Sequence, residues 1–325
     1  MNIMVKIINP VNQQELKKQG DNYIDAAGNI FPVVNGVIRI VNEGNYSDNF
    51  GFQWNKFQKT QIDREIRQSN FTKSRFFNET NWPEGGLENM DVLEAGCGAG
   101  RFTQVFLDST KGTLYSYDYS DSVSANYRNN GHYGDRLKIF QASIYEMPFA
   151  DNSFDKIFCF GVLQFTPDFK KSVKSLVDKA KPGSEIVVDF FAVNGWWTKI
   201  HAKYFLQPIT SRMSHEKLLK KIEKNIGWLM KLHFFFNKIG IGKLTNRFLP
   251  ICDIKGTFPD GLTKEEQREW AILDTFNMLS PKHEHPERPA KVVKWFKEFN
   301  TEVTFSGLVT YANGIKANVI RAVKK

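Results

Sequence analysis

The pattern of hydrophobic and polar residues becomes regular at about residue 90. From there, short hydrophobic runs alternate with amphipathic stretches of helical period, an order typical of a parallel sheet with helices on its faces. The predicted strands are Asp91–Ala95, Thr113–Asp118, Leu137–Gln141, Phe154–Phe160 and Glu185–Phe191, with helices at about 100–109, 120–130 and 168–181. After an interruption, helices follow near 264–279 and 288–299, and strands near Glu302–Ser306 and Ile315–Val323. We therefore predict a doubly wound α/β fold.

The chain before residue 90 is organised differently. Residues 1–45 contain short hydrophobic runs separated by turn signals, and Phe31–Ile40 has the pattern of a β-hairpin around Asn35-Gly36. This stretch is too short to bury a robust core by itself. The residues up to about 85 are aromatic and polar, and Trp54, Phe57 and Gln61 recur near helical spacing, which predicts at least one helix.

The net charge of +9 (44 basic minus 35 acidic residues) is concentrated in one segment. Between Lys199 and Arg247 there are 11 Lys and Arg residues against two acids, Glu216 and Glu223, so this segment alone carries +9. The rest of the chain holds 33 residues of each sign. A basic segment on a neutral body could contact an anionic substrate or an anionic lipid surface, or it could be a solvated face.

Within this basic region, Ser214–Phe236 has the period of an amphipathic helix. Its hydrophobic stripe contains Leu218, Leu219, Ile222, Ile226, Leu229, Met230 and His233, and Lys217, Lys220, Lys221, Lys224 and Lys231 lie off that stripe. We favour a helix that packs its apolar face on the domain. The alternative is a helix that lies on a membrane or over an acidic substrate.

Several features exclude whole classes of protein. No hydrophobic run approaches the roughly 20 residues needed to cross a bilayer, and the first residues lack the long apolar core of a secretory leader. Cys97, Cys159 and Cys252 lie far apart, so neither a disulfide framework nor a cysteine-rich zinc site is expected. We predict a cytoplasmic protein, with peripheral membrane contact through the basic region as an open alternative.

The strongest chemical signal is a glycine-rich loop between the first strand and the first helix of the sheet. Gly96, Gly98 and Gly100 follow an apolar strand directly, and a missing Cβ there allows a ligand to approach the backbone. The spacing G-x-G-x-G differs from the dinucleotide fingerprint G-x-G-x-x-G, and the absence of Gly-Lys-Ser/Thr excludes a triphosphate-binding loop. Asp118 closes the next strand, 18 residues after Gly100, where a carboxylate can accept hydrogen bonds from ribose hydroxyls.

Two further segments complete a family resemblance, Gln141–Phe149 and Phe154–Asp168. Together with the glycine loop and Asp118, they resemble four ordered motifs of class I S-adenosylmethionine-dependent methyltransferases of small-molecule and glycan type: E-x-G-C-G-x-G, the acidic end of strand two, D-A-x-x-L-P-F and V-L-x-H-x-P-D. The resemblance covers about residues 88–192. It implies a Rossmann-like seven-stranded sheet, S-adenosylmethionine as cofactor and S-adenosylhomocysteine as product.

Position by position, the resemblance implies a set of cofactor-binding residues. They are Glu94, Gly96, Gly98 and Gly100 for the methionine end, Asp118 for the ribose, Tyr119, Ser143 and Ile144 for the adenine, and Phe160 and Gly161 for the methyl-donor pocket. Two residues depart from the family pattern. Ser143 stands where Asp is usual, which weakens the contact to the adenine amino group, and Gln164 replaces the commoner His, so it is not named as a base.

Weaker resemblances extend to both ends of the chain. Phe31–Arg39 resembles the F-P-V-x-x-G-I-P-R strand pair of small zinc-ribbon-like domains, but the zinc cysteines are absent, so we expect a metal-free packing or oligomerisation element. Phe50–Phe57 and Leu273–Pro281 resemble segments of bacterial methyltransferases found with surface-polysaccharide or natural-product pathways. The predicted organisation is a small β-rich N-terminal element (1–45), a helical lid segment (46–87), the cofactor-binding core (88–192), a basic helical cap (193–263) and C-terminal helices with the last strands of the core (264–325).

Hydroxyl acceptors need a base, and histidine or a carboxylate is the usual one. We name His283, in a loop after the helix near 264–279, and His201, just after the fifth strand, as candidate catalytic residues. His283 and His285 could ligate a metal, but no third ligand is evident, so no metal site is predicted. Trp54 and Gln58 are predicted on a lid helix over the cofactor, and Gln164 and Trp197 near the substrate pocket; for the aromatic residues the alternative is simple core packing.

The combined prediction is an enzyme that transfers methyl from S-adenosylmethionine, at oxygen, to a small-molecule, sugar or glycan acceptor that is anionic or held near a membrane. One rival is an RNA methyltransferase, although no Asn-Pro-Pro-Tyr-type tetrapeptide follows the fourth strand and nucleic acid is not the expected partner. The other rival is a non-catalytic S-adenosylmethionine-binding scaffold. The sequence leaves the acceptor, the methylated atom and the oligomeric state open.

Overall fold

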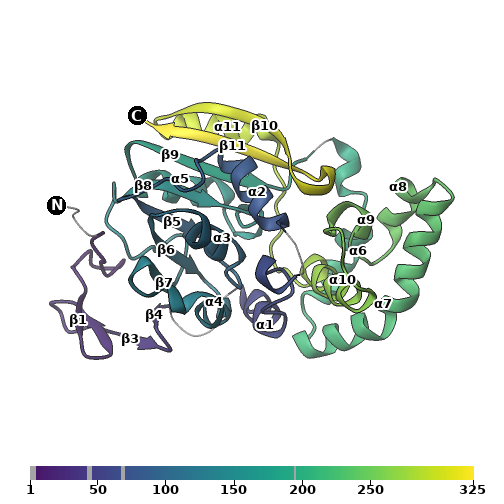
Figure 1. Cartoon of the computed structure of the whole chain (residues 1–325), viewed down its shortest axis with the longest axis horizontal. Coiled ribbons are helices and arrows are strands. Elements are labelled where there is room, and N and C mark those ends of the chain that lie inside the picture. The colour runs from purple at the N-terminus through teal and green to yellow at the C-terminus, as the bar shows by residue number, and fades with distance from the viewer. Residues whose placement is uncertain (1–4, 42–45, 67–69, 194) are drawn as a thin grey trace.

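Strands and helices alternate through the centre of the molecule (Figure 1). The computed structural model describes residues 5–41, 46–66, 70–193 and 195–325. The central elements are β5 (Asp91–Ala95), α3 (Arg101–Ser109), β6 (Thr113–Asp118), α4 (Ser122–Asn130), η2 (Gly131–Arg136), β7 (Leu137–Ala142), β8 (Phe154–Cys159), η3 (Leu163–Phe165), α5 (Phe169–Lys179) and β9 (Ala180–Phe190). The predicted succession of strands and helices is confirmed.

The largest difference from prediction lies at the start of β9, which begins at Ala180 and not at Glu185. Ala180 pairs with Phe154, and the register between the two strands shifts before Lys156. The Lys-Pro-Gly stretch at 181–183 is therefore the irregular start of a strand. From sequence alone it has the composition of a turn.

The strand order defines a doubly wound sheet. β5 lies in the middle, with β6 and β7 on one side and β8 and β9 on the other, all parallel. The last strands, β10 (Thr301–Thr310) and β11 (Lys316–Lys324), form a hairpin around η6 (Ala312–Gly314), and β11 pairs antiparallel with β9. The order β7-β6-β5-β8-β9-β11-β10 is the predicted seven-stranded Rossmann-like sheet, so the fold class is confirmed.

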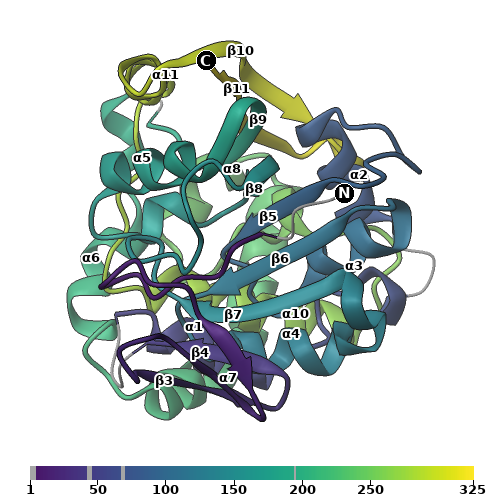
Figure 2. The same ribbon diagram turned by 90° about the vertical axis from the view of Figure 1, so that its left-hand side faces the viewer.

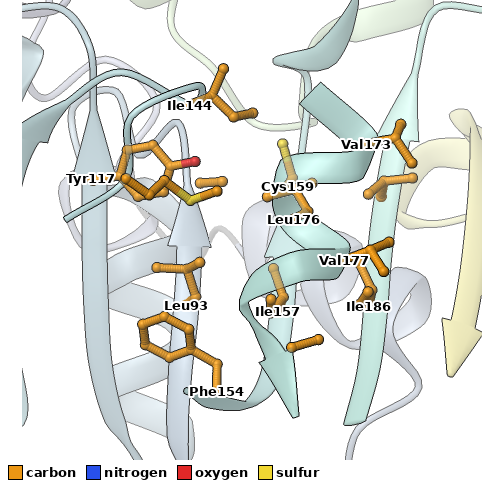
Figure 3. Packing of buried hydrophobic residues seen from close by; sticks show 14 of the residues in the cluster. Leu93, Tyr117, Ile144, Phe154, Ile157, Cys159, Val173, Leu176, Val177 and Ile186 are labelled. Carbon is orange, nitrogen blue, oxygen red and sulfur yellow. The ribbon is translucent and has the colours of Figure 1, made fainter. Parts of the chain in front are cut away.

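Hydrophobic side chains fill both faces of this sheet. On one face, α5 and α11 (Pro289–Glu298) cover the strands, and Figure 3 shows Leu93 and Ile157 of the sheet beside Leu176 of α5. On the opposite face, α3, α4 and α2 (Phe71–Thr80) bury a second cluster. In Figure 2 the helices lie to either side of the strands. The two clusters hold the carboxyl ends of the parallel strands at one common edge, and that edge carries the site.

The N-terminal segment extends the same sheet. β1 (Lys17–Gln19), β2 (Asn22–Ile24), β3 (Ile30–Val34) and β4 (Val37–Ile40) form antiparallel pairs, and β4 then pairs in parallel with β7. The hairpin predicted around Asn35-Gly36 is confirmed, and both residues have the positive φ (50° and 75°) that such a turn requires. The predicted boundary at residue 45 lies outside the described residues, and the zinc-ribbon-like assignment stays a prediction.

Two helical segments face the carboxyl edge of the sheet. The first contains α1 (Asp48–Lys56), η1 (Asp63–Glu65) and α2; the second contains η4 (Trp196–Lys199), α6 (Ala202–Thr210), α7 (His215–Lys238), α8 (Gly242–Thr245), η5 (Asn246–Phe248) and α9 (Ile254–Thr257), and it packs on α10 (Lys264–Leu279). The hydrophobic stripe of α7, including Leu218, Ile222 and Ile226, is buried against α10 together with Phe57. The favoured interpretation of this helix as one that packs on the domain is confirmed. Among the described residues, none of the helices is long and apolar enough to cross a membrane.

Candidate active site

A cavity of about 680 Å³ lies between the carboxyl edge of the sheet and the two helical segments. The residues that follow β5, β6, β8 and β9 line its sheet side, and side chains of α1, α6 and α10 line the opposite side. Ligands of open α/β sheets bind in this crevice beyond the carboxyl ends of the strands. The sequence-predicted residues that line it are Trp54, Gln58, Gly96, Gly98, Asp118, Tyr119, Ile144, Phe160 and Gly161.

Asp118 holds the glycine loop in place from the end of β6. One carboxylate oxygen, Oδ2, accepts a hydrogen bond from the Gly98 N–H at 3.0 Å, and the other, Oδ1, accepts two from the N–H and hydroxyl of Ser120 at 2.9 and 2.8 Å. Burial raises the pKa of Asp118, and these hydrogen bonds oppose the rise. Each oxygen of a carboxylate can accept more than one hydrogen bond. The group can therefore anchor the loop and still receive ribose hydroxyls from the cavity.

The three glycines of the loop are required for different reasons. All have positive φ: 79° at Gly96, 54° at Gly98 and 86° at Gly100. A Cβ on Gly96 would lie 2.2 Å from Val162, and one on Gly100 would lie 2.2 Å from Asn126, so these two positions are fixed by packing within the protein. A Cβ on Gly98 would lie 3.1 Å from the indole nitrogen of Trp54. Gly98 thus lets α1 approach the loop.

Glu94 lies beneath the loop and outside the lining of the cavity. Its Oε2 accepts hydrogen bonds from Thr103 and from the Ser116 hydroxyl (2.7 Å), while Oε1 is buried without a hydrogen-bond partner in the described structure. Burial raises the pKa of Glu94 to about 7. Its predicted contact with the methionine end is therefore not a direct one in this geometry; Glu94 and its hydroxyl partners support the loop from below. Gly100 also lies outside the cavity lining, for the packing reason given above.

Tyr119 and Ile144 line the side of the cavity where the resemblance places adenine. The Tyr119 ring lies 5.0 Å from the ring of Tyr46, which also lines the cavity and which sequence reasoning missed. Ser143, by contrast, turns its hydroxyl to the backbone N–H of Tyr145 at 3.2 Å and does not line the cavity. In this geometry the serine hydroxyl serves the local turn, and its contact with adenine stays a prediction.

Phe160 and Gly161 line the cavity after β8, where the resemblance places the methyl donor. A Cβ on Gly161 would meet no atom within 4 Å, so this glycine opens onto free space. Its N–H donates to Asp189, a buried carboxylate at the end of β9 that also lines the cavity. This end of the cavity is thus bordered by an acid that the sequence reading overlooked.

Trp54 and Gln58 belong to the segment that covers the loop, as predicted for a lid. Gln58 Oε1 accepts a hydrogen bond from Arg128 Nε at 2.8 Å, and the Asn129 side-chain amide donates both to the Gln58 carbonyl at 2.8 Å and to the Ala99 carbonyl at 2.9 Å. These bonds tie the end of α1 to the glycine loop. The lid assignment itself stays a proposal.

Besides Glu94, Gly100 and Ser143, four more predicted residues do not line the cavity. His283 packs its ring edge-on to Tyr46 at 5.6 Å, and His201 begins α6, where its Nδ1 accepts a hydrogen bond from the Lys203 N–H at 3.3 Å. Gln164 is fully buried, and Trp197 lies on the surface, stacked on Trp196 at 4.3 Å. Burial lowers the pKa of His201 to about 4. A direct catalytic role for His201 or His283 has no support from this geometry.

The cavity is also lined by charged side chains that the sequence reading did not select, and we call this part of the cavity the charged compartment. Arg75 on α2 forms ion pairs with Asp189 and with Glu79, the latter at 2.8 Å. Lys203 on α6 forms an ion pair with Glu284. Of these residues, Asp189 could have been identified from the sequence. A lone acid at the end of an otherwise hydrophobic strand is costly to bury without a function or a partner.

Arg101 is the cation of this compartment with the fewest partners. Its Nη1 donates to Gln61 Oε1 at 2.8 Å, and Gln61 Nε2 donates in turn to Asp274 Oδ1 at 3.2 Å. Within the described residues no carboxylate lies within ion-pair distance of its guanidinium. Burial, and then the charge of Arg75, lower the pKa of Arg101 to about 10. The compartment therefore holds a cation that is incompletely neutralised.

The sheet order, the glycine loop and Asp118 define the class I fold of S-adenosylmethionine-dependent methyltransferases, and the residues present fit that cofactor. Gly161 borders free space, and Asp118 lines the cavity with acceptor capacity left on its carboxylate. Residues 93–188 match the family model described as a methyltransferase domain. The chain carries a methyltransferase domain of this class.

Similar proteins include two described as tRNA U34 carboxymethyltransferase. The protein from Nautilia profundicola is 29% identical over 141 residues, which are 40% of this chain and 47% of that protein. The protein from Campylobacter curvus is 22% identical over 181 residues, 52% of this chain and 59% of that protein. The chain thus spans about half the length of these relatives. Magnesium protoporphyrin IX methyltransferase from Synechocystis PCC 6803, solved with bound S-adenosylhomocysteine, is 13% identical with a TM-score of 0.45, covering 86% of this chain and 96% of that chain.

Proposed function

We propose that this protein transfers a methyl group from S-adenosylmethionine to an oxygen of a small-molecule acceptor that carries an acidic group. The observation that carries the proposal is Arg101, whose guanidinium lines the cavity with one hydrogen bond to Gln61 and no ion pair among the described residues. A cation held in a low-dielectric site binds an anion strongly, because water cannot solvate it fully. The acid is thus the feature of the acceptor that this site would recognise.

The size and walls of the cavity support a small acceptor. Its volume of about 680 Å³ falls in the range of small-molecule pockets, roughly 300–1,000 Å³. Aromatic rings stand around Arg101: the guanidinium lies 4.6 Å from the Phe102 ring centre, and Trp270 and Tyr311 line the same compartment. Flat aromatic walls around a cation favour a ring-bearing acid.

S-adenosylmethionine would supply an electrophilic methyl group, so the task of the protein is to hold the acceptor oxygen in line with it. Arg101 would orient the acidic end of the acceptor. If the accepting oxygen is a hydroxyl, Asp189 is the candidate to receive its proton, since it contacts Gly161 at the methyl-donor end and lines the cavity. Arg75 pairs with the same carboxylate and fixes its orientation.

The test begins with calorimetric titration of the purified protein with S-adenosylmethionine and S-adenosylhomocysteine. Turnover is then measured with methyl-labelled cofactor on aromatic hydroxy acids, uronic acids and sugar phosphates, each paired with its neutral amide or alcohol. We expect methylation of an acid and little of its neutral partner. In Arg101→Gln, the KM for the acid should rise about 10- to 100-fold, the range for a lost hydrogen bond to a charged group, with cofactor affinity unchanged.

Arg212→Gln is the matched control, because Arg212 is an exposed arginine of the cap. If the protein bound neither S-adenosylmethionine nor S-adenosylhomocysteine, the enzyme proposal as a whole would be overturned. Cofactor binding with equal turnover of acids and neutral partners would overturn only the acidic acceptor.

A second candidate function is modification of a tRNA base. The observation that favours it is the similarity to the two relatives above, both described as tRNA U34 carboxymethyltransferase. Incubation of bulk tRNA with methyl-labelled cofactor, followed by nucleoside analysis, tests this candidate. Label in a tRNA nucleoside at a rate above that of every small acceptor would replace the small-molecule proposal.

A further inference from the structure

The outward face of α7 carries a regular stripe of lysine and aromatic side chains. Its members are exposed and succeed one another at intervals of four and three residues, which places them on one side of a helix. This outer stripe consists of Lys217, Lys221, Lys224, Trp228, Lys231, Phe235 and Lys238. The opposite side of α7 is the buried stripe that packs on α10. The helix therefore has two ordered faces, and only one of them packs in the core.

Exposed hydrophobic side chains continue beyond the end of α7. Ile239, Ile241, Leu244 and Phe248 are each about half exposed, between 46% and 58%, and they form what we call the tip of the cap. In Figure 1 α8 lies at the far end of the cap, away from the sheet. Of the seventeen large hydrophobic side chains that are exposed in the described residues, eleven fall between Trp196 and Phe248. On an ordinary surface, exposed hydrophobic side chains are scattered singly, so their concentration in this segment marks a distinct surface.

The stacked pair Trp196 and Trp197 adjoins the tip. Arg247, beside Phe248, donates from Nε to the Ile200 carbonyl at 3.1 Å and from Nη2 to the Trp197 carbonyl. Trp196 is 70% exposed. The tryptophans and the tip thus belong to one region, although almost fifty residues separate them in the chain.

The charge of this region is strongly positive. The segment from Lys199 to Arg247 carries 11 basic residues and two acidic ones. None of the lysines in the outer stripe forms an ion pair with a carboxylate of the described residues. Flexible lysines beside exposed tryptophan and aliphatic side chains are the composition of helices that lie in the interface of anionic membranes.

We propose that the outer stripe of α7, the tip and the Trp196–Trp197 pair form a docking surface for an anionic lipid bilayer. The lysines would be attracted to acidic headgroups, and the aromatic and aliphatic side chains would enter the boundary with the acyl chains. Ile239, Ile241 and Leu244 favour lipid over nucleic acid, because single-stranded bases are held by aromatic stacking and phosphates by cations, and neither uses exposed aliphatic groups.

The surface is connected to the cavity through α6. Lys203 of this helix lines the cavity, whereas Phe205 and Ile209, one turn apart on the same helix, are 70% and 67% exposed. Docking would thus hold the charged compartment of the cavity near the membrane. The inference does not depend on the proposed function, since a protein without turnover would dock equally well.

Co-sedimentation of the full chain with phosphatidylcholine vesicles, with and without phosphatidylglycerol, tests the proposal at low and at high salt. We expect binding to the vesicles that contain phosphatidylglycerol, weakened at high salt because exposed charges are screened. Lys224→Gln with Lys231→Gln should lower the partition coefficient about 25-fold, since each lysine near an anionic surface contributes about fivefold. Trp228→Ala with Phe235→Ala should lower binding at both salt levels.

The matched control is Lys294→Gln with Lys297→Gln, the same change of charge on two exposed lysines of α11. Equal loss of binding in the two lysine pairs would overturn the proposal, as would equal binding to neutral and anionic vesicles. Gel filtration accompanies each sample. A dimer that dissociates in the Trp228 and Phe235 variant would assign the surface to a second copy of the chain, and tRNA binding lost in the Lys224 and Lys231 variant, without vesicle binding, would assign it to RNA.

Discussion

At the scale of single residues, the cofactor site depends on side chains that serve the protein and the ligand together. Asp118 anchors the Gly98 N–H and Ser120 while it faces the cavity. Glu94 lies beneath the loop and outside the cavity lining, and Arg101 lies beside the loop and lines the cavity. The motif identified Asp118 and Glu94, whereas Arg101 and the atoms that remain accessible to a ligand became apparent only in the structure.

Asp118→Asn is the residue-scale prediction. An amide at this position presents either an oxygen or an N–H₂ group to the Gly98 N–H, and it no longer offers a charged acceptor to ribose hydroxyls. We expect the Kd for S-adenosylmethionine to rise about 10- to 100-fold, measured by calorimetry. Asp135→Asn, at a fully exposed acid, is the control. Equal affinity of Asp118→Asn and wild type would remove Asp118 from the site.

At the scale of elements, sequence patterns predicted a helix in the segment before the sheet but could not predict how α1 contacts the glycine loop. Helical spacing of Trp54, Phe57 and Gln61 predicted a helix, and α1 with its following turn is present. That its tryptophan stands 3.1 Å from the Cβ position of Gly98 follows only from tertiary packing. The same applies to β4, whose parallel pairing with β7 joins segments a hundred residues apart.

A double-mutant cycle tests this contact. Gly98→Ala should weaken S-adenosylmethionine binding partly by pushing Trp54 away, so its effect should shrink in a Trp54→Ala background. We expect a coupling free energy of about 0.5–3 kcal/mol, as for residues in contact. Gly161→Ala serves as the control, because its Cβ would meet nothing within 4 Å although φ is also positive. Coupling of Trp54 to Gly161 as strong as to Gly98 would contradict a direct contact.

At the scale of the whole molecule, burial of acids shapes the dependence of stability on pH. Burial raises the pKa of Glu94 from an ordinary 4.5 to about 7 and that of Asp274 from 3.8 to about 6, and it raises the pKa of Glu79 as well. Each carboxyl therefore holds its proton more tightly in the folded chain than in the unfolded chain. Between the unfolded and the folded pKa the folded state binds more protons, so this contribution to stability is complete below the unfolded pKa and is lost as pH rises through the folded pKa.

Glu94→Gln should flatten this dependence. Between pH 5 and pH 8 the wild-type, ligand-free protein should lose roughly 2–3 kcal/mol of unfolding free energy through Glu94 alone, which is most of the free energy equivalent to its pKa shift. The variant should lack that loss, and urea unfolding at the two pH values measures it. Glu88→Gln, at an exposed acid, should keep the wild-type dependence. An unchanged slope in Glu94→Gln would show that the buried carboxyl does not titrate in this range.

The sequence by itself determined the α/β alternation, the sheet class, the glycine loop with Asp118 and the amphipathic character of α7. These features are local, because strand and helix periods and glycine spacing depend on neighbours within a few residues. The tertiary structure decided which of them meet. It brought Arg75, Arg101 and Asp189 to one cavity from three elements, kept His201 and His283 out of its lining, and turned a stripe of lysines and aromatic side chains on α7 outward. Those outcomes depend on long-range packing, which no local pattern encodes.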